Sequence, residues 1–292
     1  MRIAYLVKRS GWQSFAERHE EGRLRRLYAK GDPTAHRLKR AHEANQRTIA
    51  ELAEALESLG VKGTQIGTRT KTISRDRFDL VVTVGGDGTL LRASHRVLDV
   101  PIVGINSDPQ TSVGFFCGIH AGAVLPSLER ALDGRLTQKT LTRMAVTLQG
   151  KVLSKRVLND ALFCHASPAA TSRYLVKIGA TSEDHKSSGF WIGPAAGSTA
   201  AQKSAGGKVL PLESEALQFI VREPYTPKGE RYELKKVLLE PGQIVEVRSK
   251  MHSGALFLDG HDDIRPKFGD VITFSRSDEP LFILGLGGTK KR

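Results

Sequence analysis

Cysteine is scarce in this sequence, which has only Cys117 and Cys164 among its 292 residues. Two cysteines do not support a disulfide framework in a chain of this length, and they provide no cysteine-based metal site. Chains that keep a few free thiols are typical of reducing compartments. We therefore expect a cytoplasmic protein.

Long apolar runs are also missing, since no stretch approaches the roughly 20 residues that a transmembrane helix needs. The first ten residues, MRIAYLVKRS, lead directly into a strand-like run without the apolar core of a secretion signal. Hydrophobic residues make up 39% of the chain and charged residues 26%, as in soluble globular proteins. These features predict a protein without membrane association that is long enough for two domains.

Acidic residues are outnumbered, with 31 against 44 basic ones and a net charge of +13. The excess is concentrated between Lys8 and Arg40, where ten basic residues face four acidic ones. Such a segment fits either a nucleic-acid-binding patch or a solvated helical face near the entrance of an anionic substrate. No RRM, KH, zinc-finger or helix-turn-helix signature accompanies it, so we expect phosphorylated small molecules rather than nucleic acid as partners.

The most informative stretch runs from Phe78 to Arg92. The segment FDLVVTV is typical of a buried strand, Gly85 and Gly86 end it in a tight turn, and a helix begins near Thr89. A glycine turn between a strand and a helix points backbone N–H groups outward, with the positive end of the helix dipole behind them. This arrangement predicts a phosphate-binding loop.

Asp87 lies in the middle of this loop, where a carboxylate would repel an anion. Either it binds a metal ion or takes a proton from an attacking hydroxyl, or it only caps the helix. The loop is not a Walker A motif, because no Lys-Ser/Thr follows the glycines, and it lacks the third glycine of the dinucleotide fingerprint.

Strands alternate with helices in the first half of the chain. The expected strands are Ile3–Val7, Phe78–Val84 and Pro101–Ile105, and the expected helices are residues 42–59 and 121–132. The segment 12–40 is expected to be partly helical, with an interruption at Gly31-Asp32-Pro33. We predict an α/β domain over residues 1–137 with a largely parallel sheet. Ligands of such sheets bind at the carboxyl ends of strands, where GGDGT and Asn106 both fall.

After residue 137 the sequence changes to short runs of alternating polarity bounded by turns. The predicted strands are Met144–Leu148, Val157–Phe163, Arg173–Ile178, Gln218–Arg222, Ile244–Arg248, Ala255–Leu258 and Val271–Phe274. We therefore expect a β-rich second domain over residues 138–280, with residues 281–292 returning to the first domain.

Two stretches of this second domain carry polar or very small residues. Asn159 and Asp160 stand together inside a predicted strand, where buried polar groups must either hold a neighbouring turn or hydrogen-bond a ligand. Small residues dominate from Gly193 to Gly207, which allows close approach either to another backbone or to a flat ligand. From these residues alone, both interpretations stay open.

Four motifs taken in order resemble those of the NAD kinases. They are GGDGT (85–89), GIN (104–106), LND (158–160) and GSTA…SAGG (197–207). Lipid kinases of the diacylglycerol and sphingosine type share GGDGT, so a lipid kinase is the alternative. Such kinases are not expected to carry the small-residue motif GSTA…SAGG. The likeness is closest to the divergent branch that includes the animal mitochondrial NAD kinases, through Asn106–Pro109, Lys186–Gly189, Arg222–Pro224 and Asp259-Gly260.

Three positions depart from the commoner bacterial pattern of the family. Asp160 stands where that pattern has Glu, Ser188 where it has Asp, and Ala201 where it has Tyr. These differences bear on how the acceptor is stacked and hydrogen-bonded, and so on the preference between NAD and NADH. They do not affect the expected fold or reaction.

The resemblance implies phosphorylation of NAD at the 2′-hydroxyl of the adenosine ribose, with ATP or polyphosphate as donor and NADP as product. It implies a catalytic role for Asp87, which would orient and deprotonate that hydroxyl. The residues expected to bind the ATP phosphates are Gly85, Gly86, Gly88, Thr89 and Asn106. Those expected to bind NAD are Asp87, Gly88, Arg92, Asn159, Asp160, Lys186, Ser188, Thr199, Ala200 and Ser204.

The resemblance also implies a divalent cation, Mg²⁺ or Mn²⁺, held through the donor phosphates with Asp87 as the candidate protein ligand. No other metal ligand is expected. NAD kinases are usually homo-oligomers with the site near a subunit interface. A homodimer or homotetramer is therefore expected here.

Overall fold

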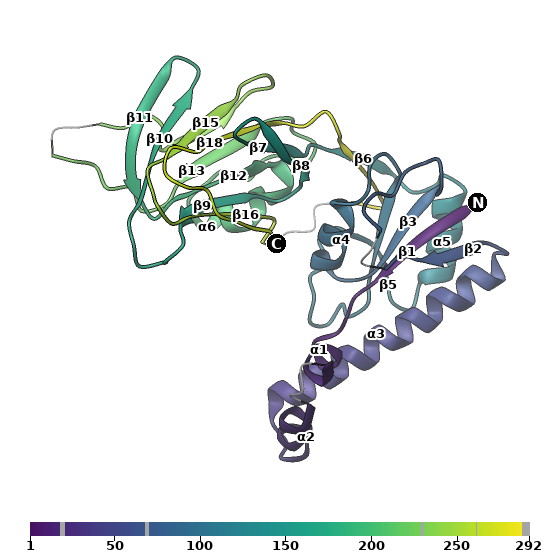
Figure 1. The fold of residues 1–292 in the computed structure, drawn as a ribbon. Coiled ribbons are helices and arrows are strands. Elements are labelled where there is room, and N and C mark those ends of the chain that lie inside the picture. Colours follow the sequence, from purple (N-terminus) through teal and green to yellow (C-terminus); the bar gives the residue numbers. More distant parts are fainter. Residues whose placement is uncertain (18–20, 68–69, 229–230, 261, 288–292) are drawn as a thin grey trace. The chain divides into compact units, whose positions relative to one another are not determined.

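The computed structural model describes residues 1–17, 21–67, 70–228, 231–260 and 262–287 (Figure 1). It divides the chain into two compact units, one of Met1–Lys139 with the segment that begins at Phe282, the other of Thr140–Leu281. The first is an α/β unit with a mostly parallel sheet and the second is β-rich and antiparallel, which confirms the predicted fold class. Positions 18–20 of the basic segment and 288–292 of the expected return lie outside the described residues.

The first unit is built on a seven-stranded sheet in the order β2-β1-β3-β4-β19-β6, with β5 beside β4. Its strands are β1 (Arg2–Val7), β2 (Lys62–Gln65), β3 (Leu80–Gly85), β4 (Ile102–Asn106), β5 (Cys117–His120), β6 (Gln138–Leu141) and β19 (Leu281–Leu284). Its helices are α1 (Gly11–Glu17), α2 (Glu21–Ala29), α3 (Pro33–Ser58), α4 (Asp87–Ser94) and α5 (Val124–Leu132). β1, β3, β4 and β19 run parallel, so a strand from the end of the chain completes this sheet.

Helices cover both faces of this sheet. Val82 of β3 and Val103 of β4 belong to a core shared with α3 and α5. Leu90 of α4 packs on the other face, where it lies against Gly104. Burial on both faces explains why these strands are almost continuously apolar. Within the described residues, no helix combines the length and the hydropathy that crossing a bilayer requires.

α3 begins earlier than the apolar spacing over residues 42–59 indicates. The Asp32 carboxylate caps it by accepting the Ala35 N–H at 2.9 Å, Pro33 occupies the first turn, and Gly31 has φ 79°. The predicted interruption at these residues is therefore confirmed as the boundary between α2 and α3. Figure 1 shows the N-terminal part of α3 extending beyond the sheet, with α1 and α2 packed beside it.

The second unit has two six-stranded antiparallel sheets, ordered β11-β10-β15-β18-β7-β8 and β14-β13-β12-β9-β16-β17. The strands of the first sheet are β7 (Met144–Leu148), β8 (Lys151–Val157), β10 (Ser172–Ile178), β11 (Thr181–Ser187), β15 (Val245–Ser249) and β18 (Val271–Arg276). Those of the second are β9 (Ala161–His165), β12 (Phe190–Pro194), β13 (Leu217–Val221), β14 (Lys236–Leu239), β16 (Gly254–Leu258) and β17 (Asp262–Ile264). A short η1 (Ala195–Thr199) and α6 (Ala201–Ser204) follow β12.

Aromatic side chains join the two sheets of this unit into one core. The ring of Phe190 on β12 lies 4.8 Å from that of Phe219, 5.3 Å from that of Tyr174 and 5.8 Å from that of Phe274. Such pairs contribute about 0.5–1.5 kcal/mol each beyond the area they bury. They fix β12 firmly, and β12 leads directly into η1 and α6.

Candidate active site

The GGDGT loop joins β3 to α4, as the sequence predicts. Gly86 is the N-cap of α4, and no side chain caps the first turn of this helix. No capping side chain therefore occupies the N–H groups at the start of this helix, although the Asp87 carboxylate lies in its first turn. Since Asp87 is the first residue of the helix, the interpretation of Asp87 as the N-cap is wrong.

Two of the three glycines in this loop are closely packed against neighbouring side chains. A Cβ on Gly85 would lie 2.3 Å from Thr89 Oγ1, and one on Gly86 would lie 2.6 Å from Ser112 Oγ. A Cβ on Gly88 would meet no atom of the described protein within 4 Å. Internal packing therefore does not explain a glycine at position 88. The simplest reason for it is that a ligand approaches the backbone closely there.

Asp87 is half-buried and fixed in position by the segment that follows β4. Its Oδ1 accepts the backbone N–H of Phe116 at 2.8 Å. The carboxylate is thus oriented by a contact from outside its own helix. A side chain held this way beside a phosphate loop suits a base or a cation ligand.

Lys8 and Arg9 are candidates that the sequence motifs did not indicate. They follow β1, which lies between β2 and β3, so the crossover direction reverses between β1 and β3 at their position. The Lys8 N–H donates to the Val84 carbonyl at 2.8 Å, and the Lys8 Cβ would lie 2.9 Å from a Cβ on Gly85. The sequence feature that could have indicated them is a pair of adjacent basic residues directly after the first strand.

Asn106 shapes the loop beside the glycines. It is buried at the end of β4, where its Nδ2 donates to the Ser112 carbonyl at 2.9 Å and its Oδ1 accepts the Asp108 N–H at 3.2 Å. The Asn106 side chain therefore bonds to the 107–112 loop, and Ser112 of this loop lies against Gly86. Asn106 would act on a bound phosphate indirectly, by holding this loop in place. Arg92 is exposed in the last turn of α4.

In the second unit, the predicted strand Val157–Phe163 is wrong in its middle. β8 ends at Val157 and β9 begins at Ala161, with a bend between them. The carboxylate of Asp259 accepts the three consecutive N–H groups of this bend, from residues 158, 159 and 160, at 2.8, 2.7 and 3.0 Å. These bonds replace strand pairing there. Sequence motifs gave Asp259 no role beyond its place in a late Asp-Gly pair.

The bend presents one buried acceptor that no described residue satisfies, the side-chain oxygen of Asn159, and next to it the buried carboxyl of Asp160. Asp160 is 8% exposed, and Asn159 Oδ1 is buried without a partner among the described residues. Burial, with a smaller contribution from the charge of Asp259, raises the pKa of Asp160 to about 7. Unmatched buried acceptors are costly unless a ligand donates to them. The pair therefore indicates a site for a ligand rich in hydroxyl donors.

The small-residue stretch presses against the back of this bend. A Cβ on Gly193 would lie 2.3 Å from the Asn159 carbonyl oxygen, and one on Gly197 would lie 1.7 Å from it. The buried Gln202 donates to the same oxygen at 3.0 Å and accepts from Gln218 at 3.1 Å. Of the two interpretations left open by the sequence, close approach to another backbone is the one found at these glycines.

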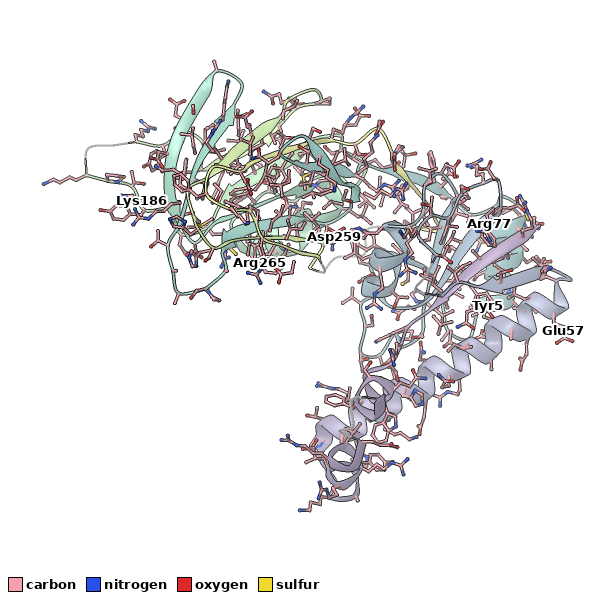
Figure 2. The ribbon with its side chains drawn as sticks, in the orientation of Figure 1. Tyr5, Glu57, Arg77, Lys186, Asp259 and Arg265 are labelled. Atoms are coloured by element: carbon pink, nitrogen blue, oxygen red, sulfur yellow. The ribbon has the colours of Figure 1, made fainter. Side chains whose placement is uncertain are left out.

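The other predicted NAD-binding residues lie at varying distances from this bend. Thr199 and Ala200 are half-buried at the end of η1, and Ser204 is exposed at the end of α6. Ser188 is half-buried, and its backbone carbonyl accepts a hydrogen bond from the Arg222 guanidinium at 3.3 Å. Lys186 is exposed on β11, and Figure 2 places it well apart from Asp259. Within one chain, the structure does not bring Lys186 to the bend.

No group of three or more His, Cys, Asp or Glu side chains could hold a metal ion within the part of the chain that the structure describes. Mg²⁺ in phosphotransferases commonly uses one or two carboxylates and the phosphates of its substrate. The single carboxylate of Asp87 beside a phosphate loop fits a cation that arrives with the donor.

Comparison with known proteins points in one direction. The family model described as the ATP-NAD kinase N-terminal domain matches residues 26–136, which include GGDGT and Asn106. The chain is 37% identical over 226 residues to a probable NADH kinase of Oryza sativa subsp. japonica, covering 70% of this chain and 69% of that protein. It is 30% identical over 233 residues to an NAD kinase of Methanocorpusculum labreanum, covering 76% of this chain and 80% of that protein.

A solved structure shares the fold over nearly the whole chain. It is an NAD kinase from Archaeoglobus fulgidus in complex with ATP, which superposes with a TM-score of 0.66 at 22% identity. The match covers 97% of this chain and 93% of that one. At this level of identity the likeness establishes the fold alone.

Proposed function

This chain belongs to the NAD kinase family and is a kinase of NAD or NADH, and from that premise we propose that it transfers the γ-phosphoryl group of ATP to the adenosine ribose 2′-hydroxyl. One observation carries the acceptor side of the proposal. Asn159 presents an unmatched buried acceptor on the bend, and the buried carboxyl of Asp160 lies next to it in the chain. A ribose supplies the hydroxyl donors that such a pair needs.

On the donor side, the phosphates lie along GGDGT. The N-terminus of α4 and the backbone at Gly88 face the donor, and Lys8 and Arg9, which follow β1, add positive charge on this side of the sheet for the donor phosphates. A divalent cation brought by ATP, with Asp87 as its candidate protein ligand, would neutralise charge on the phosphates.

Asp87 acts on the acceptor in this proposal. Its carboxylate accepts the proton of the 2′-hydroxyl, whose oxygen forms the new bond to phosphorus as the bond to the ADP oxygen breaks. The hydrogen bond from Phe116 keeps the carboxylate from rotating away. Asp160 and Asn159 bind the ribose and orient it.

For the redox state of the acceptor, we propose that NADH is used at least as well as NAD. The relatives of 37% and 38% identity are a probable NADH kinase and an NADH kinase from plants, whereas the archaeal NAD kinase is 30% identical. Asp160 and Ser188, both departures from the commoner family pattern, are candidates for this preference.

The test incubates the full chain with ATP and Mg²⁺ in parallel with NAD, NADH or diacylglycerol. NADP and NADPH are measured with a dehydrogenase specific for the 2′-phosphorylated cofactor. We expect product from both dinucleotides, with kcat/KM for NADH equal to or above that for NAD. Phosphorylated lipid without NADP(H) would overturn the proposal, and replacing ATP by polyphosphate tests the donor.

We also propose that the chain forms a homodimer or homotetramer. Lys186, which one chain alone keeps away from the 158–160 bend, is then available for contacts beyond its own chain. Light scattering coupled to size exclusion gives the mass in solution. A monomer at micromolar concentration would overturn this part.

A further inference from the structure

A cavity of about 670 Å³ lies in the first unit between α3 and the loop that follows β4. The loop lines it with residues 107–111, and α3 lines it with Arg37, Arg40 and Arg47 among others. None of its lining residues belongs to GGDGT. The volume is in the range that small-molecule ligands of nucleotide size occupy.

The three arginines form one row on α3. Their spacing of three and seven residues places them on the same face of the helix, with Ala44 between Arg40 and Arg47. All three are exposed, and none makes a hydrogen bond or ion pair with a residue that the structure describes. Neighbouring charges on the same helix do pair, since Lys39 lies 3.5 Å from Glu43.

The acidic residues of the cavity are bound to other groups. The two carboxylate oxygens of Glu51 accept the N–H groups of Gly122 and Val124, each at 2.9 Å, at the start of α5. Asp108 accepts the hydroxyl of Thr111, and Glu43 pairs with Lys39. The guanidinium groups are therefore the groups in this cavity whose charge has no bound partner in the described protein.

We propose that this α3 pocket, defined by Arg37, Arg40, Arg47 and the 107–111 loop, binds linked phosphate groups of a nucleoside di- or triphosphate or an inorganic polyphosphate. Planar guanidinium groups match phosphate oxygens in paired hydrogen bonds. The hydroxyl of Ser107 on the facing wall adds a donor. The site is additional to GGDGT and to the 158–160 bend, and so goes beyond the function proposed above.

The pocket is connected to the phosphate loop through one short segment. Ser107 lines the pocket and its N–H donates to the Gly85 carbonyl at 3.0 Å. Ser112, at the other end of the segment, lies against Gly86. An occupant of the α3 pocket therefore contacts the segment that supports GGDGT, and its binding can alter how the donor is held.

The test measures binding of inorganic tripolyphosphate to the full chain by calorimetry, with neither NAD nor ATP present. The pocket variant is Arg37→Gln/Arg40→Gln/Arg47→Gln. The control is Arg23→Gln/Arg25→Gln/Arg26→Gln, which removes the same charge from exposed residues of α2. We expect the pocket variant to bind at least about tenfold more weakly and the control to stay within about threefold of wild type.

Equal losses in the two variants would overturn the proposal, because they would reflect net charge alone. Undetectable binding to the wild type would overturn it as well. If the triple variant does not fold, Arg40→Gln against Arg40→Lys decides: the lysine must recover part of the affinity. The assay contains no turnover, so its result is independent of whether the chain phosphorylates NAD.

Steady-state kinetics of the same two variants identify the source of the phosphates. A raised KM for ATP confined to the pocket variant means that the donor itself reaches the pocket. An unchanged KM, with turnover of the wild type altered by tripolyphosphate and turnover of the pocket variant not, means a separate ligand. Either result supports the site.

Discussion

Asp87 is held by a hydrogen bond that an asparagine could also accept. In Asp87→Asn the amide oxygen can keep the contact with Phe116 N–H while the charge and the basic oxygen are lost. General-base catalysis contributes about 10²–10⁴-fold, so we expect kcat to fall by that factor with an unchanged unfolding temperature. Steady-state kinetics and thermal denaturation check this. A variant that keeps a tenth of wild-type turnover would contradict the role.

Asp160 provides a separate prediction for the acceptor. A charge-assisted hydrogen bond is worth roughly 1.5–3 kcal/mol, so Asp160→Ala should lower kcat/KM for NAD by about 10–150-fold. The KM for ATP should barely change, and Asp160→Glu should retain much of the activity. An equal rise in both KM values, or an unfolded Asp160→Ala variant, would mean that the carboxylate is structural.

The same carboxyl makes stability depend on pH. Its pKa rises from 3.8 to about 7 in the folded protein, so between these values the folded state binds the proton more tightly than the unfolded chain does. The free energy of unfolding therefore falls as pH rises through this range, by up to about 4 kcal/mol. Asp160→Asn removes this effect. In urea denaturation, the free energy of unfolding of the variant should increase relative to that of the wild type between pH 4 and pH 8. A difference in this free energy that does not change with pH would contradict the raised pKa of Asp160.

Asp259 acts through the bend that it holds. Asp259→Asn replaces one carboxylate oxygen by an NH₂ group that faces backbone donors, so we expect a raised KM for NAD and a loss of about 1–3 kcal/mol in stability. It also removes a charge that raises the pKa of Asp160. The pH midpoint of kcat/KM for NAD should therefore move down. The control is Asp263→Asn, at an exposed position of β17. An unchanged pH midpoint in Asp259→Asn would mean that the role of Asp259 is purely structural.

At the scale of elements, substitutions at a glycine of α4 and a glycine of η1 should distinguish an effect on ligand binding from an effect on packing. Gly88→Ala adds a methyl group where the protein leaves open space, so helix stability should rise by about 0.5–1 kcal/mol while the KM for ATP rises. Gly197→Ala forces a Cβ to within 1.7 Å of the Asn159 oxygen and should destabilise the second unit. Denaturation and kinetics of both variants check this. An unchanged KM for ATP in Gly88→Ala would show that ATP does not approach the backbone at Gly88.

Elements with strong local signals could be predicted from the sequence. The alternating run Met144–Leu148 is β7 residue for residue, and the apolar run before GGDGT is β3 with a shift of about two residues. Gly31, Asp32 and Pro33 mark the start of α3, because their turn and capping chemistry is local. The same holds for the phosphate loop, whose glycines and helix start lie within five residues.

Features that depend on contacts far apart in the chain could not be predicted. Asp259 reaches the N–H of Asn159 across 100 positions, and no periodicity of residues 157–163 reveals that their middle is a bend. Lys8 comes to lie beside Gly85 only because β1 pairs with β3. α5 begins at Val124, after the expected residue 121, because Glu51 of α3 accepts the N–H groups at its start. Such placements follow from topology, which a single stretch of sequence does not contain.

At the scale of the whole molecule, the excess of positive charge has two distinct uses. The chain carries +13, and its basic residues include both the α3 pocket and the exposed residues of α2. A bound ligand interacts with individual guanidinium groups at short range, whereas an approaching anion is attracted by the summed electrostatic field of all the charges. Substrates and donors of this enzyme are anions, so a long-range field raises their encounter rate.

Neutralising the basic residues of α2 together with Lys30, which follows the helix, tests the long-range effect of the charge. We expect a variant with Arg23, Arg25, Arg26 and Lys30 replaced by Gln to keep the wild-type kcat, because these residues lie outside the GGDGT loop and the 158–160 bend. Its kcat/KM for ATP should depend less steeply on salt between 0.05 and 0.3 M, since steering of charged ligands weakens as the ionic atmosphere shortens the field. Tight, salt-sensitive binding of the wild type to duplex DNA at about 0.15 M salt, lost in this variant, would instead show that the segment binds nucleic acid.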